Sequence, residues 1–182
     1  MTVFLRVPVD RLGVIIGPGG EMRRQLEEKS GIQIEVDSEH NEVALHDEAP
    51  GTDPVMLLKL RDVVRALARG FSPEHAMRLF SDEFYFEMVD IHDYVGKRKG
   101  HVRRLTSRIV GTEGRTRRII EEMTGCHLAI YGHTVGIVGD LEGLTSAREA
   151  VDMVLQGSEH ATVYRFLENQ RRRQRSKEFG IS

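Results

Sequence analysis

The sequence predicts an α+β protein made of two copies of one small module, each with the element order β-α-α-β-β-α. Three observations support this prediction. A segment occurs twice without a gap, the spacing of apolar residues changes between strand-like and helix-like stretches, and a glycine-rich loop lies at the same place in each copy. A chain of 182 residues is long enough for two small domains.

The internal repeat is the strongest signal in the chain. Residues 15–36 read IIGPGGEMRRQLEEKSGIQIEV, and residues 109–130 read IVGTEGRTRRIIEEMTGCHLAI, at an offset of 94 residues. Eight of the 22 paired positions are identical, and most other pairs keep their polarity where burial requires it. Two copies of one module explain this agreement better than chance does.

In the first copy, alternating apolar residues predict strands, and a helical period predicts the helices between them. The expected strands are residues 3–8, 32–36 and 42–46, and the expected helices are residues 10–16, 21–30 and 54–71. Residues 17–20 cannot continue a helix, because glycine and proline are the poorest helix formers. Gly31 is typical of a helix C-terminus.

The second copy repeats this order. Its expected strands are residues 84–91, 126–131 and 134–138, and its expected helices are residues 102–110, 115–124 and 144–155. We therefore divide the chain into a first module, a connector, a second module and a basic helical C-terminal tail, at residues 1–72, 73–82, 83–158 and 159–182. We expect the two modules to pack together, because the connector is short.

The charge of the chain is unevenly distributed, although its net value is only −2. Residues 1–96 contain 10 Lys and Arg against 18 Asp and Glu, a net charge of −8, whereas residues 97–182 contain 16 against 10, a net charge of +6. This asymmetry suggests a basic half that meets an anion. The acidic half then meets no anion, or it meets a basic partner.

The chain lacks the signals of a membrane or secreted protein. No apolar run approaches the roughly 20 residues needed to span a bilayer, and no signal peptide is visible at the N-terminus. The single cysteine, Cys126, cannot form an internal disulfide and is expected to be a small buried apolar residue. These features predict a cytoplasmic protein that makes no contact with a membrane.

The two glycine loops are suited to hold a phosphodiester. Glycine lets another backbone approach closely, and the helix that follows starts with unpaired amide groups and a partial positive charge. Together these features make a binding site for a phosphate group. The loop residues expected to contact a nucleic-acid backbone are Gly17, Pro18, Gly19 and Gly20 in the first copy and Gly111, Thr112, Glu113 and Gly114 in the second.

Arginines in the first turns of the following helices support this interpretation, because a cation there opposes the helix dipole. The candidate residues are Arg23, Arg24, Arg115, Arg117 and Arg118. The alternative is a structural role, in which four of them pair with a glutamate one turn later for about 0.2–0.5 kcal/mol each. For Arg23 and Arg24 the two interpretations are nearly balanced.

A basic segment leads to the second loop. Residues 97–118 hold nine Lys and Arg and one acid, which suggests a surface that contacts phosphates, although a solvated helix face is the alternative. The residues that we expect to contact nucleic-acid phosphates here are Lys97, Arg98, Lys99, Arg103 and Arg104. A second basic cluster at residues 171–177 is either another contact with nucleic acid or a frayed tail.

The glycine loops and the element order resemble the type I KH fold, which has an Ile-Gly-x-x-Gly core. Here that core is Ile16-Gly17-Pro18-Gly19-Gly20. The resemblance implies two tandem type I KH domains, which clamp about four nucleotides of single-stranded nucleic acid. It also implies that apolar residues of the groove support bases, namely Ile15, Ile34, Val110 and Leu128, although each one taken singly is more readily a core residue. Both loops depart from the family pattern, because they carry Pro18 and Glu113 where a basic residue is common.

Residues 108–140 and 157–173 are similar to the archaeal relatives of the Partner of Nob and Krr ribosome-assembly proteins. This resemblance implies binding of small-subunit rRNA near its 3′ end. It also implies partnership with the Nob endonuclease and with the initiation factor two alpha subunit.

Two other functions remain as alternatives. In one, the first module docks a protein, and only the second binds RNA. In the other, the chain is a nucleotide-dependent enzyme, but it has no H-E-x-x-H, no Cys/His metal set and no G-x-x-x-x-G-K-[ST] loop. The histidines His127, His133 and His160 are expected in a strand, a turn and a surface position. We therefore predict a non-catalytic protein without a cofactor or a metal site.

Overall fold

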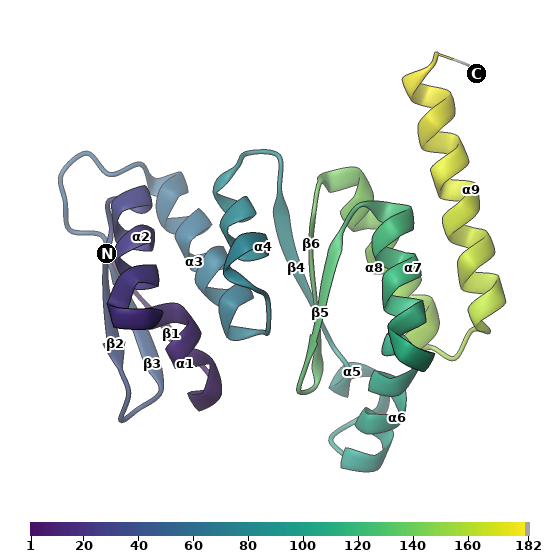
Figure 1. The fold of residues 1–182 in the computed structure, drawn as a ribbon, viewed down its shortest axis with the longest axis horizontal. Helices are drawn as coiled ribbons and strands as arrows, with labels where there is room; N and C mark the ends of the chain where they lie inside the picture. The colour runs from purple at the N-terminus through teal and green to yellow at the C-terminus, as the bar shows by residue number, and fades with distance from the viewer. Residues whose placement is uncertain (181–182) are drawn as a thin grey trace. The chain divides into compact units, whose positions relative to one another are not determined.

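A computed structural model describes residues 1–180, which form two compact units (Figure 1). The first unit is Met1–Phe84, and the second begins at Tyr85. Each unit contains a three-stranded antiparallel sheet together with helices, so the predicted α+β class and the two-module architecture are confirmed. The packing of one module against the other stays a prediction.

The first unit has the predicted element order. Its sheet has the order β1-β3-β2, in which β3 pairs with both neighbours. The elements are β1 (Thr2–Arg6), α1 (Val9–Ile16), α2 (Glu21–Ser30), β2 (Gln33–Asp37), β3 (Glu42–His46) and α3 (Pro54–Ala68). The closing helix α3 ends before the predicted Phe71, because Gly70 adopts a φ of 101°, which is outside the helical region.

The segment that we treated as a connector is folded. It forms α4 (Pro73–Met77) and a 3₁₀ turn at Arg78–Phe80, with the expected helical turn directly after Pro73. Ala76, Leu79 and Phe80 are buried, and both elements pack against α3. This segment therefore belongs to the first compact unit, which ends at Phe84, whereas we had ended the first module at residue 72.

The second unit repeats the order and adds two helices. Its sheet has the order β4-β6-β5, and its elements are β4 (Tyr85–Asp90), α5 (His92–Val95), α6 (Lys99–Val110), α7 (Arg115–Thr124), β5 (His127–Tyr131), β6 (Thr134–Gly139), α8 (Leu141–Leu155) and α9 (His160–Glu178). The short helix α5 was not predicted. Helix α8 begins three residues earlier than predicted, because the Asp140 carboxylate accepts the Gly143 amide at 2.7 Å and caps the helix there.

The C-terminal tail is a regular helix that packs on the second module. Val163 and Leu167 of α9 are buried in the same apolar core as Ile109, Ile120 and Val151. Figure 1 shows α9 beside α7 and α8, and both of these helices contact it. Over the described length of α9, the tail is therefore part of the second unit rather than a frayed end.

Two further predictions concern the single cysteine and membrane-spanning helices. Cys126 is 1% exposed and lies in the core of the second unit, as predicted. Among residues 1–180, no helix has both the length and the apolar character required to cross a membrane.

Candidate nucleic-acid interface

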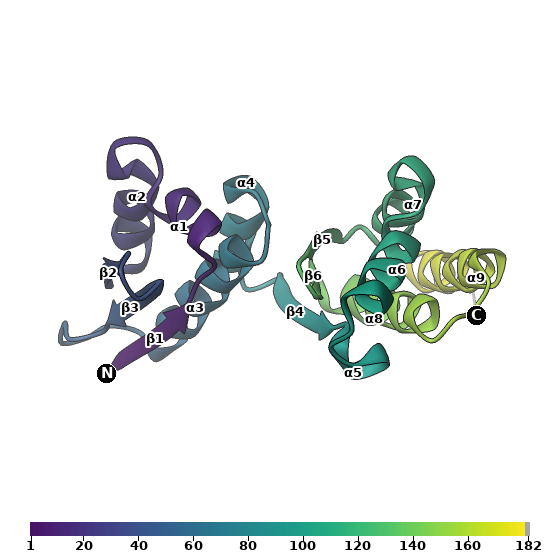
Figure 2. The same ribbon diagram turned by 90° about the horizontal axis from the view of Figure 1, so that it is seen from below.

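Each glycine loop is a tight 3₁₀ turn between two helices. The turns are Pro18–Gly20, between α1 and α2, and Thr112–Gly114, between α6 and α7 (Figure 2). The glycine before each turn has nearly the same backbone in both units, with φ and ψ of 73° and 170° at Gly17 and 75° and 172° at Gly111. Residues with a side chain essentially never adopt this conformation.

A close contact also restricts these two positions to glycine. A Cβ atom on Gly17 would lie 2.5 Å from the Cβ atom of Met22, and one on Gly111 would lie 2.3 Å from the Oγ1 atom of Thr116. The first residues of α2 and α7 therefore pack directly on the backbone of the preceding corner. This packing holds the two helices of each module at a fixed angle around the turn.

Some of the amide groups that we expected to be unpaired are hydrogen-bonded within the turns. Gly20 donates its N–H to the carbonyl of Gly17 at 3.1 Å, and Gly114 donates to the carbonyl of Gly111 at 3.2 Å. Neither following helix has a side-chain cap. The expectation that every amide at these helix starts is unpaired is therefore wrong in part, because the 3₁₀ turn bonds to itself.

The middle of each turn faces solvent. Pro18, Gly19, Thr112 and Glu113 are exposed, so neither turn is covered by its own chain. Glu113 adopts a φ of 55°, which is rare for a residue with a side chain, and its carbonyl accepts a bond from Arg118 at 3.3 Å. Strained backbone of this kind is concentrated at functional sites.

The arginines after the turns differ in their partners. Arg23 pairs with Glu27 at 3.6 Å, which is the structural role that we had left open for it. Within residues 1–180, none of the other three expected pairs lies within ion-pair distance. Arg24, Arg115, Arg117 and Arg118 are exposed. Their guanidinium groups are accessible to a phosphate.

The basic segment before the second turn also lies on the surface. Lys97, Arg98, Lys99, Arg103 and Arg104 are exposed at the start of α6 and in the residues before it. Arg108 is the exception, because it is half-buried and donates to the carbonyl of Ser158. We name the exposed surface of α6, the second turn and α7 the basic face; its residues are Lys97, Arg98, Lys99, Arg103, Arg104, Arg115, Arg117 and Arg118.

Helix α9 supports the second turn from both sides. His160 donates from Nε2 to the carbonyl of Arg108 at 3.0 Å, just before the turn. The hydroxyl groups of Tyr164 and Thr116 lie 3.0 Å apart, just after the turn. These contacts were not predicted from the sequence, because the hydroxyl pair spans 48 residues and has no local signal.

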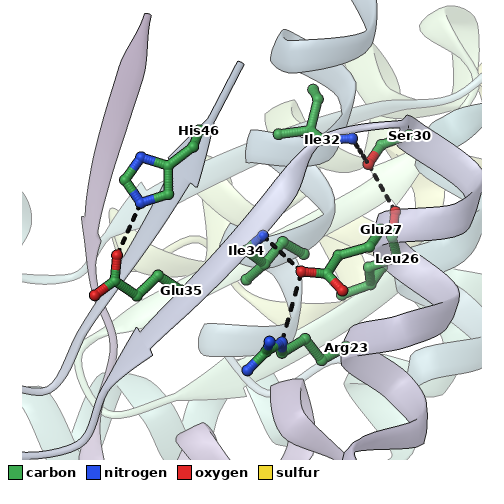
Figure 3. Close-up of polar contacts among 8 residues, drawn as sticks. All are labelled: Arg23, Leu26, Glu27, Ser30, Ile32, Ile34, Glu35 and His46. Carbon is green, nitrogen blue, oxygen red and sulfur yellow. Dashed lines mark hydrogen bonds and ion pairs between the residues drawn. The ribbon is translucent and has the colours of Figure 1, made fainter. Parts of the chain in front are cut away.

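A polar connection between helix and edge strand recurs in both units. In the first unit, the Glu27 carboxylate accepts a hydrogen bond from the amide of Ile34 at 2.8 Å (Figure 3). The Ser30 hydroxyl donates to the Leu26 carbonyl at 2.7 Å and accepts a bond from the Ile32 amide at 3.2 Å. The second unit makes the same bonds through residues at an offset of 94, namely Glu121 with Leu128 and Thr124 with Ile120 and Cys126.

The apolar residues of the expected groove belong to the core. Ile15 and Ile34 are 0% exposed and Leu128 is 5% exposed, so they offer no surface to a base. Val110 is half-buried. The expectation that these aliphatic side chains support bases is therefore wrong for three of the four, because each of those three is buried in the core.

A hollow of about 370 Å³ lies beside the first turn. Its lining is mainly apolar or uncharged, and Glu21 is the only charged residue in it; the lining residues are Gly13, Val14, Gly17, Pro18, Glu21, Met22, Gln25 and Pro73. The first turn therefore has an environment different from that of the second, whose flanking helices are cationic.

Comparison with known families agrees with this geometry. Residues 85–172 match a model described as the eukaryotic type KH-domain, or KH-domain type I, and residues 2–54 match the KH domain model. A KH domain-containing protein of Methanocaldococcus jannaschii is 42% identical over 170 residues, which are 93% of this chain and 74% of that protein. The RNA-binding protein pno-1 of Caenorhabditis briggsae is 34% identical over 141 residues, which are 76% of this chain and 51% of that protein. This chain belongs to the Partner of Nob family of KH-domain proteins.

Solved structures of similar chains support the assignment to the Partner of Nob family. Dim2p from Pyrococcus horikoshii is 38% identical with a TM-score of 0.85, over 93% of this chain and 99% of that one. A chain in the crystal structure of an a/eIF2alpha–aDim2p–rRNA complex from the same organism is 37% identical with a TM-score of 0.87, over 94% of each chain. A protein of unknown function from Aeropyrum pernix is 38% identical with a TM-score of 0.92, over 100% of this chain and 98% of that one.

Proposed function

We propose that this protein is a non-catalytic RNA-binding factor that acts during maturation of the small ribosomal subunit, and that its second unit holds single-stranded RNA. One observation carries the proposal: the exposed glycine turn of the second unit lies between two helices whose exposed cations form the basic face. The relatives named RNA-binding protein pno-1 and Dim2p support the same function.

The chemistry of the site suits a sugar–phosphate backbone. The open turn admits a phosphate close to the polypeptide, and the guanidinium groups of Arg115, Arg117 and Arg118 supply charge-assisted hydrogen bonds. The cations at the start of α6 add affinity that does not depend on sequence and that decreases with salt concentration. The roles of the residues named for both turns and for the basic face are part of this proposal.

The partners follow from the related complex. Because a chain 37% identical to this one occurs in a complex with a/eIF2alpha and rRNA, we propose small-subunit rRNA and the initiation factor two alpha subunit as partners of this protein. The Nob endonuclease is a further proposed partner, and the proposed site of action is the cytoplasm. The bonds, burial and charges of the site are those of a binding surface, and we assign no catalytic residue.

The test is RNA binding by Gly114→Asp compared with Gly125→Asp. Gly114 directly precedes α7, and Gly125 directly follows it. Their backbones are nearly the same, with φ and ψ of 74° and 14° at Gly114 and 72° and 6° at Gly125. A Cβ atom added to either glycine would have no other atom within 4 Å. A carboxylate at Gly114 repels the bound phosphate, so we expect affinity for a short single-stranded RNA to fall by about tenfold or more.

Gly125→Asp carries the same charge and the same backbone cost, but it lies at the far end of α7, so we expect its affinity to stay within about twofold of the wild-type value. Fluorescence anisotropy of a labelled RNA measures both variants. Equal affinities for the two variants would show that the second turn does not hold RNA.

A second function is supported for the first unit. The hollow beside its turn is lined mainly by apolar or uncharged residues and by one acid. Residues 1–84 hold 10 Lys and Arg against 15 Asp and Glu, a net charge of −5, which suits a protein partner better than RNA. Gly19→Asp tests this point, with Gly31→Asp as its control at a similar positive φ. Unchanged RNA affinity in Gly19→Asp supports protein docking, whereas a loss like that of Gly114→Asp assigns RNA binding to both turns.

A further inference from the structure

Three chain segments bring Asp90, His92 and His133 together at one end of the second sheet. Asp90 ends β4, His92 begins α5, and His133 lies in the turn between β5 and β6. The backbone holds these segments in place, because Asp90 pairs with Thr134 and the amide of Ile91 donates to the carbonyl of His133 at 2.7 Å. One ligand atom from each of the three side chains lies within 4.8 Å of the other two.

The three side chains converge on a single carboxylate oxygen. Oδ1 of Asp90 lies 2.8 Å from Nδ1 of His133 and 3.6 Å from Nδ1 of His92. The two imidazole rings stack with their centroids 4.0 Å apart and an interplanar angle of 10°. The side chains are 27–41% exposed, so the cluster is open to an ion and to water.

Two imidazole nitrogens and one carboxylate oxygen form a donor set that Zn²⁺ and related transition ions bind well, whereas Mg²⁺ and Ca²⁺ prefer oxygen ligands alone. We propose that Asp90, His92 and His133 form a binding site for Zn²⁺ or a similar transition ion, with water in the remaining position. The site is separate from the RNA-binding function proposed above. No spacing motif in the sequence predicts it, because the ligands span 43 residues.

Metal binding requires a small rearrangement that the local structure permits. Ligand atoms around a tetrahedral Zn²⁺ lie about 3.3 Å apart, close to the distances between Asp90 and the two imidazoles. The rings must leave their parallel stack, because each imidazole binds a metal in its own plane. His92 is the ring that can turn, since it begins a helix of only four residues.

A bound ion would connect β4, α5 and the turn between β5 and β6. Helix α5 directly precedes Lys97, Arg98 and Lys99 of the basic face and packs against α6. The ion would thereby restrict the motion of the chain that leads into the basic face. The metal is structural in this proposal, since the cluster lies at a sheet end and no reacting group is assigned to it.

The experiment is a metal titration of the full chain without a tag, after treatment with a chelator. We expect one equivalent of Co²⁺ to give the visible absorption bands of a tetrahedral site, Zn²⁺ to displace it, and Zn²⁺ to raise the melting temperature. His133→Ala and His92→Ala each remove one ligand, so we expect each to weaken Zn²⁺ binding by about tenfold or more.

The chain offers a matched control in its first unit. Nδ1 of His40 lies 2.7 Å from Oδ2 of Asp37, so His40→Ala also removes a histidine–aspartate contact, but this pair is not part of a group of three among the described residues. We expect His40→Ala to bind Zn²⁺ like the wild-type protein. Circular dichroism checks that each variant folds, and His92→Ala decides the result if His133→Ala does not fold.

Two outcomes would overturn the proposal. One is the absence of saturable Co²⁺ and Zn²⁺ binding by the wild-type chain. The other is equal Zn²⁺ affinity in the wild-type chain, His92→Ala and His133→Ala. In either case the cluster is only a hydrogen-bonded contact between strand and turn. The result is independent of the RNA-binding test, because that test changes residues in the glycine turns.

Discussion

The carboxylate of Glu121 in α7 accepts the backbone amide of Leu128 in β5, with 2.9 Å between Oε1 and the nitrogen. Strand β5 is at the edge of its sheet, so this amide would otherwise have no strand partner. The equivalent bond between Glu27 and Ile34 satisfies the same position of β2. One glutamate in each module therefore joins the second helix to the edge strand. The two glutamates are half-buried, and the residues whose amides they accept, Ile34 and Leu128, are buried.

Removing this acceptor should destabilise the second unit. We expect Glu121→Ala to lower the free energy of unfolding by about 1–3 kcal/mol, because it leaves a buried amide without a partner. Glu121→Gln keeps an oxygen acceptor and should cost less than Glu121→Ala. Urea unfolding followed by circular dichroism measures both. Glu122→Ala is the control, since Glu122 is exposed on the same helix, and an equal loss in that variant would refute the role of Glu121.

The corner glycines should tolerate no side chain. An added Cβ at Gly111 lies 2.3 Å from Oγ1 and 2.7 Å from the backbone nitrogen of Thr116, and the backbone there has a φ of 75°. We expect Gly111→Ala to lower the free energy of unfolding by more than about 2 kcal/mol, because strain and a backbone clash act together.

Gly13→Ala is the matched comparison for the corner glycine. Gly13 lies inside α1, and an added Cβ has no atom within 4 Å. Alanine is the better helix former, so we expect this variant to be more stable than the wild-type protein by about 0.5–1 kcal/mol. Thermal unfolding of the two variants should therefore shift in opposite directions, and an unchanged or raised melting temperature in Gly111→Ala would contradict the assignment of Gly111 as a corner.

The hydroxyl pair between Tyr164 and Thr116 should link α9 to the second turn. We expect Tyr164→Phe to cost about 1 kcal/mol of stability, the usual value of one hydrogen bond, and to weaken RNA binding because Thr116 packs on Gly111. A double-mutant cycle with Thr116→Val isolates the pair energy. Tyr85→Phe serves as the control at an exposed tyrosine, and RNA affinity equal in both phenylalanine variants would remove the positioning role.

Local constraints explain why so much of the fold could be predicted. The bounds of α2 and α7 are those expected, because Gly20 and Gly31, or Gly114 and Gly125, adopt positive φ values at the two ends of each helix. A glycine acts on its own backbone, so its effect is visible in the sequence. The repeat then transfers each element of one module to the other. The exposed cations of the basic face follow in the same way from local charge.

Contacts between distant segments were not predictable. Arg108 looks like a member of the basic segment, yet it is bonded to the Ser158 carbonyl across 50 residues. The aliphatic residues Ile34 and Leu128 fit the resemblance as base supports, but burial places them in the core. The approach of His133 to Asp90 depends on the register of β4 and β6, which no local pattern specifies. The turns and the charge around them were therefore predictable from the sequence, whereas the contacts that support the turns were not.

The thiol of Cys126 should be unreactive in the folded protein. Burial, partly offset by a bond with Thr124, raises the pKa of this thiol from 9.0 to about 11, and the residue is 1% exposed. At pH 8 the folded protein therefore presents almost no thiolate, and we expect an aromatic disulfide reagent to react only after urea is added. Cys126→Ala gives the blank for this assay.

The same shift gives Cys126 a defined effect on stability at alkaline pH. Because the pKa is raised in the folded state, the folded protein keeps its proton while the unfolded chain loses it. The stabilisation that the Cys126 thiol contributes to the folded state is fully present below 9.0, the pKa of this thiol in the unfolded chain. It is lost as the pH rises through about 11, the pKa of this thiol in the folded protein. Between pH 9 and pH 11, we expect the urea concentration at the midpoint of unfolding to fall as the pH rises in the wild-type protein. We expect a smaller fall in Cys126→Ala. Equal pH dependence in the two proteins would mean that Cys126 is not the titrating group.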